Sequence, residues 1–153
     1  MNLIRAEIMA LKLITEHCPE YNLQFDNAKT RFGYCNHKHK IISLSKPLVL
    51  LNDESIVKNT LLHEIAHALT PHDRGHGVVW RAKALELGCD AKRCCSIEEV
   101  NVIKGRFTYV CTTCGRESSY HKRLRRLRAC GDCCRKLNGG VYSKEFLLKQ
   151  KEE

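Results

Sequence analysis

The 153-residue chain carries 26 Lys and Arg against 17 Asp and Glu, for a formal net charge of +9, and 43% of its residues are hydrophobic. This length allows one modest hydrophobic core, and a second small module would need a metal ion to hold it. No apolar run approaches the roughly 20 residues of a membrane-spanning helix, and the first residues lack a signal-peptide layout. We therefore expect a soluble intracellular protein with no membrane partner, in the cytoplasm or, in a eukaryote, in the nucleus.

The positive charge is concentrated in the C-terminal third. Residues 1–100 contain 13 Lys and Arg against 12 Asp and Glu, whereas residues 101–153 contain 13 against 5. Such an asymmetry favours contact with a polyanion, most simply nucleic acid, and a merely solvated basic surface is the alternative. Four of the ten cysteines fall in two Cys-x-x-Cys pairs, which in a reducing compartment predicts zinc ligands rather than disulfides.

The first third of the chain is predicted to form one helix followed by short strands. Apolar residues recur at helical spacing over residues 2–17, and Cys18-Pro19 ends the helix. We expect this to be a packing helix through Leu3, Ile4, Ile8, Leu11 and Ile14, with Met9 and Leu13 filling in. Short apolar runs broken by turn residues then predict strands near 23–26, 29–35 and 40–45, arranged as an antiparallel meander.

His37 and His39 lie at alternate positions before the last of these strands. Alternate strand residues share a face, so the two could bind a metal ion, but no third ligand is nearby in the sequence. We interpret them as solvated residues of a hairpin tip, and Cys35 as a packed thiol.

A helix over residues 53–69, with Asn52 as its N-cap, is predicted to carry the chemistry. It contains His63-Glu64-Ile65-Ala66-His67 in apolar surroundings, where two incidental, unpaired histidines and a glutamate would be costly. Residues four apart share one helix face, so both histidines can bind one metal ion with Glu64 beside it. Zinc with three protein ligands lowers the pKa of its water to about 7, and Glu64 is the expected general base.

A third ligand must follow this helix, which stops at Thr70-Pro71. His72 and His76 are the two candidates. Thr70 and Asp73 occupy positions where metzincins have a glycine and a histidine, so that class is excluded. The glycines of Gly75-His76-Gly77 would let the loop bring His76 back to the metal, whereas His72 follows a proline near the helix end.

Residues 78–87 again show helical spacing, with Gly88 as a C-terminal cap. We expect Trp80 to be a core anchor that holds the turn around His76. Residues 89–104 are predicted to link two modules, and three cysteines there lack a matching second pair, so we interpret them as structural or free thiols: Cys89, Cys94 and Cys95.

The second module contains two Cys-x-x-Cys pairs separated by fifteen residues, Cys111 with Cys114 and Cys130 with Cys133. This spacing is typical of a zinc ribbon, in which four thiolates close the coordination sphere and the metal holds the fold together. Cys134 competes for the fourth position, but the two-residue gap favours Cys133.

A basic run lies between the two pairs. Phosphate contact is its expected use, with the aromatic ring at its start stacking on a base of single-stranded nucleic acid; the candidate residues are Tyr120, Lys122, Arg123, Arg125, Arg126 and Arg128. The alternative is a hairpin in which Leu124 and Leu127 pack inward and the arginines are simply solvated. We favour nucleic-acid binding because the basic residues lie in a module that a metal ion is expected to hold rigid.

Together these motifs resemble the SprT-like zinc metalloprotease family. The resemblance covers nearly the whole chain and rests on the helix motif, on Gly75-His76-Gly77, Trp80, residues 25–29, Gly33 and residues 42–45, and on the cysteine ribbon. It implies that His76 is the third zinc ligand and that Cys133 completes the ribbon. It also implies an endopeptidase that acts on DNA-bound or DNA-crosslinked proteins.

The combined prediction is an α+β protein in three parts. A zincin-like core of helices on a short antiparallel-rich sheet spans residues 1–104, a four-cysteine zinc ribbon residues 105–140, and a C-terminal tail residues 141–153. We expect a monomer with a protein substrate, DNA as a partner and two zinc ions, one catalytic at His63, His67 and His76 and one structural at Cys111, Cys114, Cys130 and Cys133. The alternative is a catalytically silent nucleic-acid-binding or adaptor protein, against which the intact Glu64 argues.

Overall fold

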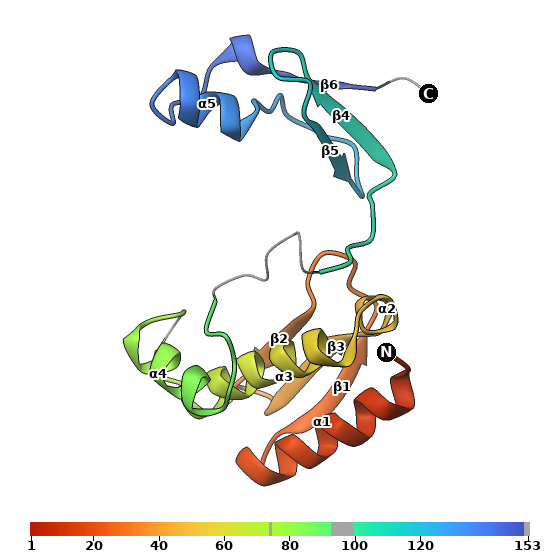
Figure 1. The fold of residues 1–153 in the computed structure, drawn as a ribbon, viewed down its shortest axis with the longest axis vertical. Coiled ribbons are helices and arrows are strands. Elements are labelled where there is room, and N and C mark those ends of the chain that lie inside the picture. The colour runs from red at the N-terminus through yellow and green to blue at the C-terminus, as the bar shows by residue number, and fades with distance from the viewer. Residues whose placement is uncertain (74, 93–99, 152–153) are drawn as a thin grey trace. The chain divides into compact units, whose positions relative to one another are not determined.

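The computed structural model describes residues 1–73, 75–92 and 100–151 (Figure 1). The chain divides into two compact units, Met1–Ile103 and Lys104–Glu153, each with its own buried cluster. Among the described residues, no helix is both long enough and apolar enough to cross a membrane.

Unit 1 packs helices against a small mixed sheet. Its elements are α1 (Leu3–His17), β1 (Asn22–Asp26), β2 (Gly33–Asn36), β3 (Ile41–Ser45), α2 (Lys46–Leu51), α3 (Glu54–Leu69) and α4 (Val78–Glu86). Strand β3 lies in the middle of the sheet, parallel to β1 and antiparallel to β2. The predicted antiparallel meander is therefore wrong, and β2 forms one edge of the sheet.

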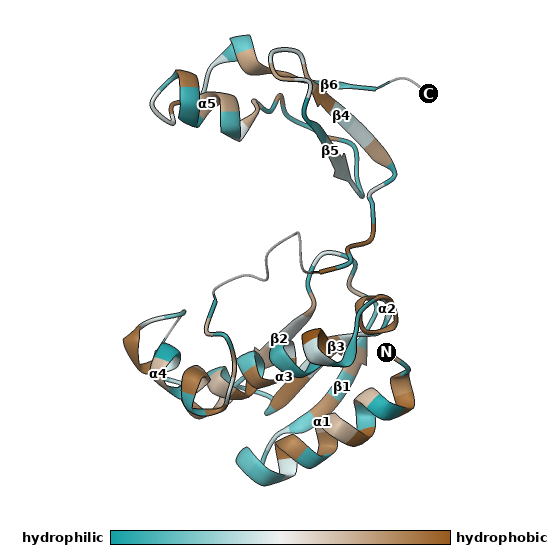
Figure 2. Ribbon diagram, in the orientation of Figure 1, coloured by the Kyte–Doolittle hydropathy of each residue, from teal (hydrophilic) through white to brown (hydrophobic). Residues whose placement is uncertain are grey.

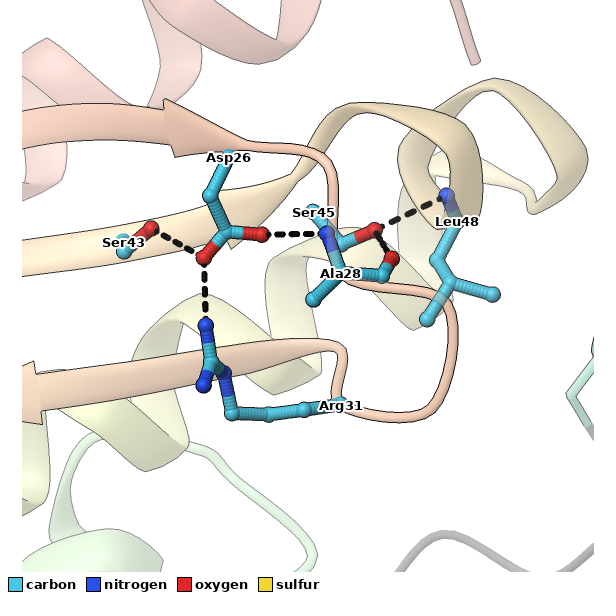
Figure 3. Close-up of polar contacts among 6 residues, drawn as sticks. All are labelled: Asp26, Ala28, Arg31, Ser43, Ser45 and Leu48. Atoms are coloured by element: carbon cyan, nitrogen blue, oxygen red, sulfur yellow. Dashed lines mark hydrogen bonds and ion pairs between the residues drawn. The ribbon is translucent and has the colours of Figure 1, made fainter. Parts of the chain in front are cut away.

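The loop between β1 and β2 shows why the strands take this order. Ser45 at the end of β3 ties that loop back: its hydroxyl donates to the Ala28 carbonyl over 2.6 Å, and its N–H donates to the Phe32 carbonyl over 2.7 Å. The Ser45 hydroxyl also accepts from Leu48 N–H and so caps α2 (Figure 3). These contacts hold the end of β1 beside the end of β3, which requires a parallel pair.

Helix α1 packs on the core through small side chains. Ala6, Ala10 and Ile14 are buried, and the two alanines let the helix approach its neighbours closely. Ile4 and Ile8 are instead 67% and 64% exposed, and Leu11 is also exposed, so the expected packing face is wrong at these three positions. Apolar and polar residues alternate along the helix (Figure 2).

Helix α3 is the central element of unit 1, with buried residues on several of its faces. It begins at Glu54 after Asp53, so the predicted N-cap at Asn52 is one residue too early. Asn52 is buried instead, because its side-chain amide donates to the carbonyls of Leu48 and Asn101 over 2.8 and 2.9 Å. This residue therefore ties the end of α2 to the chain that leaves unit 1.

Unit 2 is a three-stranded antiparallel sheet beside a short helix. Its elements are β4 (Phe107–Cys111), β5 (Glu117–Tyr120), α5 (Gly131–Leu137), a 3-10 turn (Lys144–Phe146) and β6 (Leu148–Gln150), with strand order β5-β4-β6. The segment predicted as a separate tail belongs to this unit, because β6 pairs with β4 and Phe146 is buried among the cysteines. The strand order β5-β4-β6 depends on pairing between β4 and β6, which are far apart in the sequence.

Candidate functional site

Three histidine rings converge in unit 1. Helix α3 supplies His63 and His67, one turn apart, and the loop before α4 supplies His76. The Nε2 atom of His76 lies 3.0 Å from that of His63 and 3.2 Å from that of His67. These three residues form a group that could hold a metal ion, whereas His72 is exposed and outside it.

The loop that carries His76 is held by Asp73. The Asp73 carboxylate accepts hydrogen bonds from the backbone N–H groups of Gly77 and Trp80, over 3.3 and 2.9 Å, and so caps α4. A Cβ on Gly77 would lie 2.5 Å from the Asp73 carboxylate, and Gly75 has φ of +138°, so both glycines are needed. The sequence signal for this cap was an aspartate four residues before Gly77, the N-cap residue of α4.

Trp80 packs against all three histidine rings and is completely buried. Its ring centroid lies 4.4 Å from that of His76 and 4.7 Å from that of His63, and it stacks on His67 at 5.2 Å. This contact agrees with the expected role of Trp80 as an anchor. Burial lowers the pKa of His63 and of His67 to about 4, so both rings are neutral at pH 7.

The geometry and protonation of this group fit a zinc ion. Nitrogens at about 2.0–2.1 Å from a tetrahedral ion are about 3.3 Å apart, close to the observed separations of 3.0 and 3.2 Å. A metal also requires neutral imidazoles, which the lowered pKa values of His63 and His67 provide. His63, His67 and His76 are therefore suited to hold one metal ion together.

Glu64 is buried beside the three rings, with 8% of its surface exposed. Burial raises its pKa to about 7, against the opposing effects of the positive charge of Arg31 and a hydrogen bond with the Cys35 backbone. Strand β2 approaches closely here: a Cβ on Gly33 would lie 3.1 Å from Glu64 Cγ. The absence of a side chain at Gly33 thus lets the sheet edge and the carboxylate meet.

A cleft of about 810 Å³ opens over the histidines and Glu64. Residues on and around β2 line the cleft, including Arg31 and His37, neither of which was predicted to be a site residue. His37 was expected to be only a solvated tip residue, but it lines the cleft and its Nδ1 lies 3.0 Å from the Tyr21 hydroxyl. His39 belongs to no metal-binding group among the described residues.

Unit 2 gathers four cysteines into one group, Cys111, Cys114, Cys130 and Cys133. The Cys111 and Cys133 sulfurs are 3.8 Å apart, as are those of Cys114 and Cys130. Sulfurs at about 2.3 Å from a tetrahedral zinc ion are separated by about 3.8 Å, so the group fits a structural zinc.

The remaining cysteines lie outside this group. Cys134 is buried in the same cluster but is not one of the four, and Cys89 is buried in unit 1. Cys94 and Cys95 lie outside the described residues.

The basic run forms part of an exposed surface of unit 2 with two aromatic rings in it. Lys122, Arg123, Arg125, Arg126 and Arg128 are all exposed, and Tyr120 is half-buried at the end of β5. The Arg128 guanidinium lies 5.6 Å from the Tyr120 ring centroid, and that of Arg123 lies 5.5 Å from the Phe107 ring centroid. Leu127 is 70% exposed and does not pack inward as the alternative interpretation required.

Comparison with known proteins places the chain in a family. Residues 8–100, more than half of the chain, match the SprT-like family, and the chain belongs to that family. The predicted family is thereby confirmed, and the helices and small sheets of the structure confirm the predicted α+β fold class.

Two individual proteins are similar to it. Protein SprT of Proteus mirabilis (strain HI4320) is 28% identical over 107 residues, which cover 67% of this chain and 64% of that relative's length. The crystal structure of the metallopeptidase zymogen jannalysin of Methanocaldococcus jannaschii aligns with a TM-score of 0.46 and 18% identity, covering 53% of this chain and 79% of that one.

Proposed function

We propose that this protein is a zinc-dependent endopeptidase whose substrates are proteins bound or crosslinked to DNA. The observation that carries the proposal is the arrangement in unit 1. Three imidazole nitrogens converge within metal-binding distance, and a buried carboxylate lies beside them in an open cleft. A purely structural zinc site would gain from a fourth ligand and would have no use for Glu64.

The chain's own residues divide the work of peptide hydrolysis. His63, His67 and His76 would hold a zinc ion, which when bound polarises a carbonyl and acidifies water. Glu64 accepts the proton of the attacking water and passes it to the leaving amine, and burial makes its carboxylate a stronger base than an exposed one. Trp80 and Asp73 keep the three rings in place.

Strand β2 would hold the substrate. Within the described sheet its only neighbour is β3, so its other edge can pair with an extended peptide. Residues of β2, Gly33 to Cys35, line the same cleft as Glu64. A peptide paired there would pass alongside the carboxylate with its backbone extended.

Unit 2 would bring the enzyme to DNA. Its four cysteines would hold a structural zinc, and its exposed arginines would contact phosphates. Arg128 lies over the Tyr120 ring and the Tyr109 ring meets that ring edge-on, so Tyr120 is better suited to orient Arg128 than to stack on a base.

The test is cleavage of a DNA-binding protein, followed on a gel with and without single-stranded DNA. We expect wild-type protein to cleave and Glu64→Gln to be inactive while still binding two zinc ions per chain. Glu54→Gln, the same substitution in the exposed first turn of α3, is the matched control and should cleave normally. Full activity of Glu64→Gln would refute the proposed base.

The DNA part is tested separately. Replacing four exposed arginines by glutamine should weaken DNA binding and flatten its dependence on salt: Arg123, Arg125, Arg126 and Arg128. An unchanged affinity would show that this surface is only solvated. No cleavage by any form of the protein, together with DNA binding, would instead favour the adaptor alternative.

A further inference from the structure

One wall of the cleft carries a guanidinium group that the proposed chemistry does not use. Arg31 lies in the loop just before β2 and lines the same cleft as Glu64 and the three histidines. Its side chain is half exposed, so a molecule in the cleft can reach it.

Two contacts fix the position of this guanidinium. One Nη atom donates to the Asp26 carboxylate over 2.6 Å, and the guanidinium carbon lies 4.4 Å from the Tyr34 ring centroid. Figure 3 shows the Arg31 side chain running alongside β2 to reach Asp26. An arginine held in this way loses little conformational entropy when it binds a further group.

Asp26 is itself held in its charged form. Although burial would raise its pKa, hydrogen bonds from the Ala28 N–H and the Ser43 hydroxyl, each 2.8 Å long, and the ion pair with Arg31 lower it overall (Figure 3). The loop is also tied to β3 through Ser45, independently of Arg31. The fold of this loop thus has other anchors, and Arg31 lines the cleft with its side chain half exposed.

A guanidinium presents five donors, and the hydrogen bond to Asp26 engages one Nη atom. The remaining donors suit a carboxylate, which accepts two hydrogen bonds from one arginine. Lys92 also lines the cleft and is likewise paired with an acid, Asp90 at 3.8 Å, but an ammonium lacks the planar fork that gives a carboxylate two parallel hydrogen bonds.

We propose that Arg31 is a substrate-binding residue that selects peptides with an aspartate or glutamate close to the bond that is cut. This inference rests on the proposed endopeptidase function and names a preference of the same cleft. A peptide paired with the edge of β2 would bring its side chains past the start of that strand, where Arg31 lies.

A peptide carboxylate fits this position better than a nucleic-acid phosphate. Residues 1–100 carry almost balanced charge, 13 basic against 12 acidic, whereas the basic excess lies in residues 101–153. The cleft itself also contains the acids Glu64, Asp73 and Asp90, which would repel a run of phosphates but tolerate one carboxylate at Arg31.

The test measures binding rather than cleavage, using zinc-loaded full-length Glu64→Gln protein. Fluorescent peptides of one sequence carry either glutamate or glutamine at successive positions. At one position or more we expect the glutamate peptide to bind about three- to fivefold more tightly, and 0.5 M salt to reduce the difference, as for a half-exposed ion pair.

Variants then test whether the preference for glutamate peptides depends on Arg31. In the Glu64→Gln background, Arg31→Gln should abolish it, Arg31→Lys should retain part of it, and Arg81→Gln, an exposed arginine of α4 outside the cleft, should leave it unchanged. Thermal unfolding of each variant checks that it is folded.

The outcomes separate the two proposals. A glutamate preference that survives Arg31→Gln, or no preference at any position, overturns the role of Arg31 and leaves the endopeptidase proposal standing. If a single-stranded oligonucleotide displaces the peptide from protein with Arg31 but not from Arg31→Gln, then Arg31 binds DNA, and the inference is overturned. If no peptide binds and wild-type protein cleaves nothing, both proposals fail.

Discussion

The two candidate metal sites are attached to their units in opposite ways. In unit 1 the histidines lie on a core that is already complete, with Trp80, Ile42, Leu44 and Leu61 almost fully buried. In unit 2 the buried cluster consists of Cys111, Cys130, Cys133, Cys134 and Phe146, so three of the four proposed ligands are themselves the core. We infer that a metal ion in unit 1 would supply chemistry, whereas one in unit 2 would supply the fold.

Removal of the metal ions should have the largest effect and should reveal the difference between the two units. Structural zinc contributes on the order of 10 kcal/mol or more in small modules, so a chelator should unfold unit 2 and leave unit 1 folded. NMR spectra should lose amide dispersion for residues 107–150 and keep it for residues 3–69. Cys111→Ser should reproduce the effect, and Cys134→Ser should retain the zinc. Simultaneous unfolding of both units by the chelator would contradict the comparison.

A second prediction concerns the cost of the buried acid in unit 1. In metal-free protein, Glu64 has its pKa raised to about 7 from 4.5. The folded protein therefore favours the protonated form of Glu64. The contribution of Glu64 to stability is fully present below pH 4.5 and is lost as the pH rises through 7. At pH 8 metal-free Glu64→Gln should be more stable than wild type by roughly 3 kcal/mol, and at pH 4 the two should be equal.

Urea unfolding in the presence of a chelator, followed by the fluorescence of the single tryptophan, measures this difference. Burial lowers the pKa values of His63 and His67, so these two residues add stability above pH 6.5 that is lost as the pH falls through about 4. That contribution is common to both proteins and cancels in the comparison. A constant difference between Glu64→Gln and wild type at all pH values would contradict the raised pKa of Glu64.

The smallest expected effect tests how closely the site depends on the sheet edge. A Cβ at Gly33 would lie 3.1 Å from Glu64 Cγ and 3.0 Å from the Ser43 carbonyl oxygen, so Gly33→Ala must displace the carboxylate or the strand. We expect about a tenfold fall in kcat, equivalent to about 1.4 kcal/mol, with the zinc content unchanged. Wild-type kcat in this variant would show that the close approach has no catalytic consequence.

Much of the local structure could be predicted because it depends on residues that are close together in the sequence. The helix from Glu54 to Leu69 and the short helix around Trp80 follow from apolar spacing, and both Cys-x-x-Cys pairs lie in the second unit. Periodicity also explains the error on α1. Large apolar residues marked one face of that helix, but Ile4, Ile8 and Leu11 of that face are exposed. Ala6 and Ala10, which carry little hydropathy signal, pack on the core beside Ile14.

Local sequence patterns were enough to identify the chemical groups and their spacing: two histidines one turn apart with Glu64 between them, and two cysteine pairs. The fold was needed to show that His76, and not His72, lies with those histidines, that β3 separates β1 from β2, and that Arg31 lines the cleft. This division reflects the range of the interactions. Helical spacing is set by neighbours a few residues apart, whereas strand order and the walls of a cleft depend on contacts between distant segments, which leave no periodic signal in the chain.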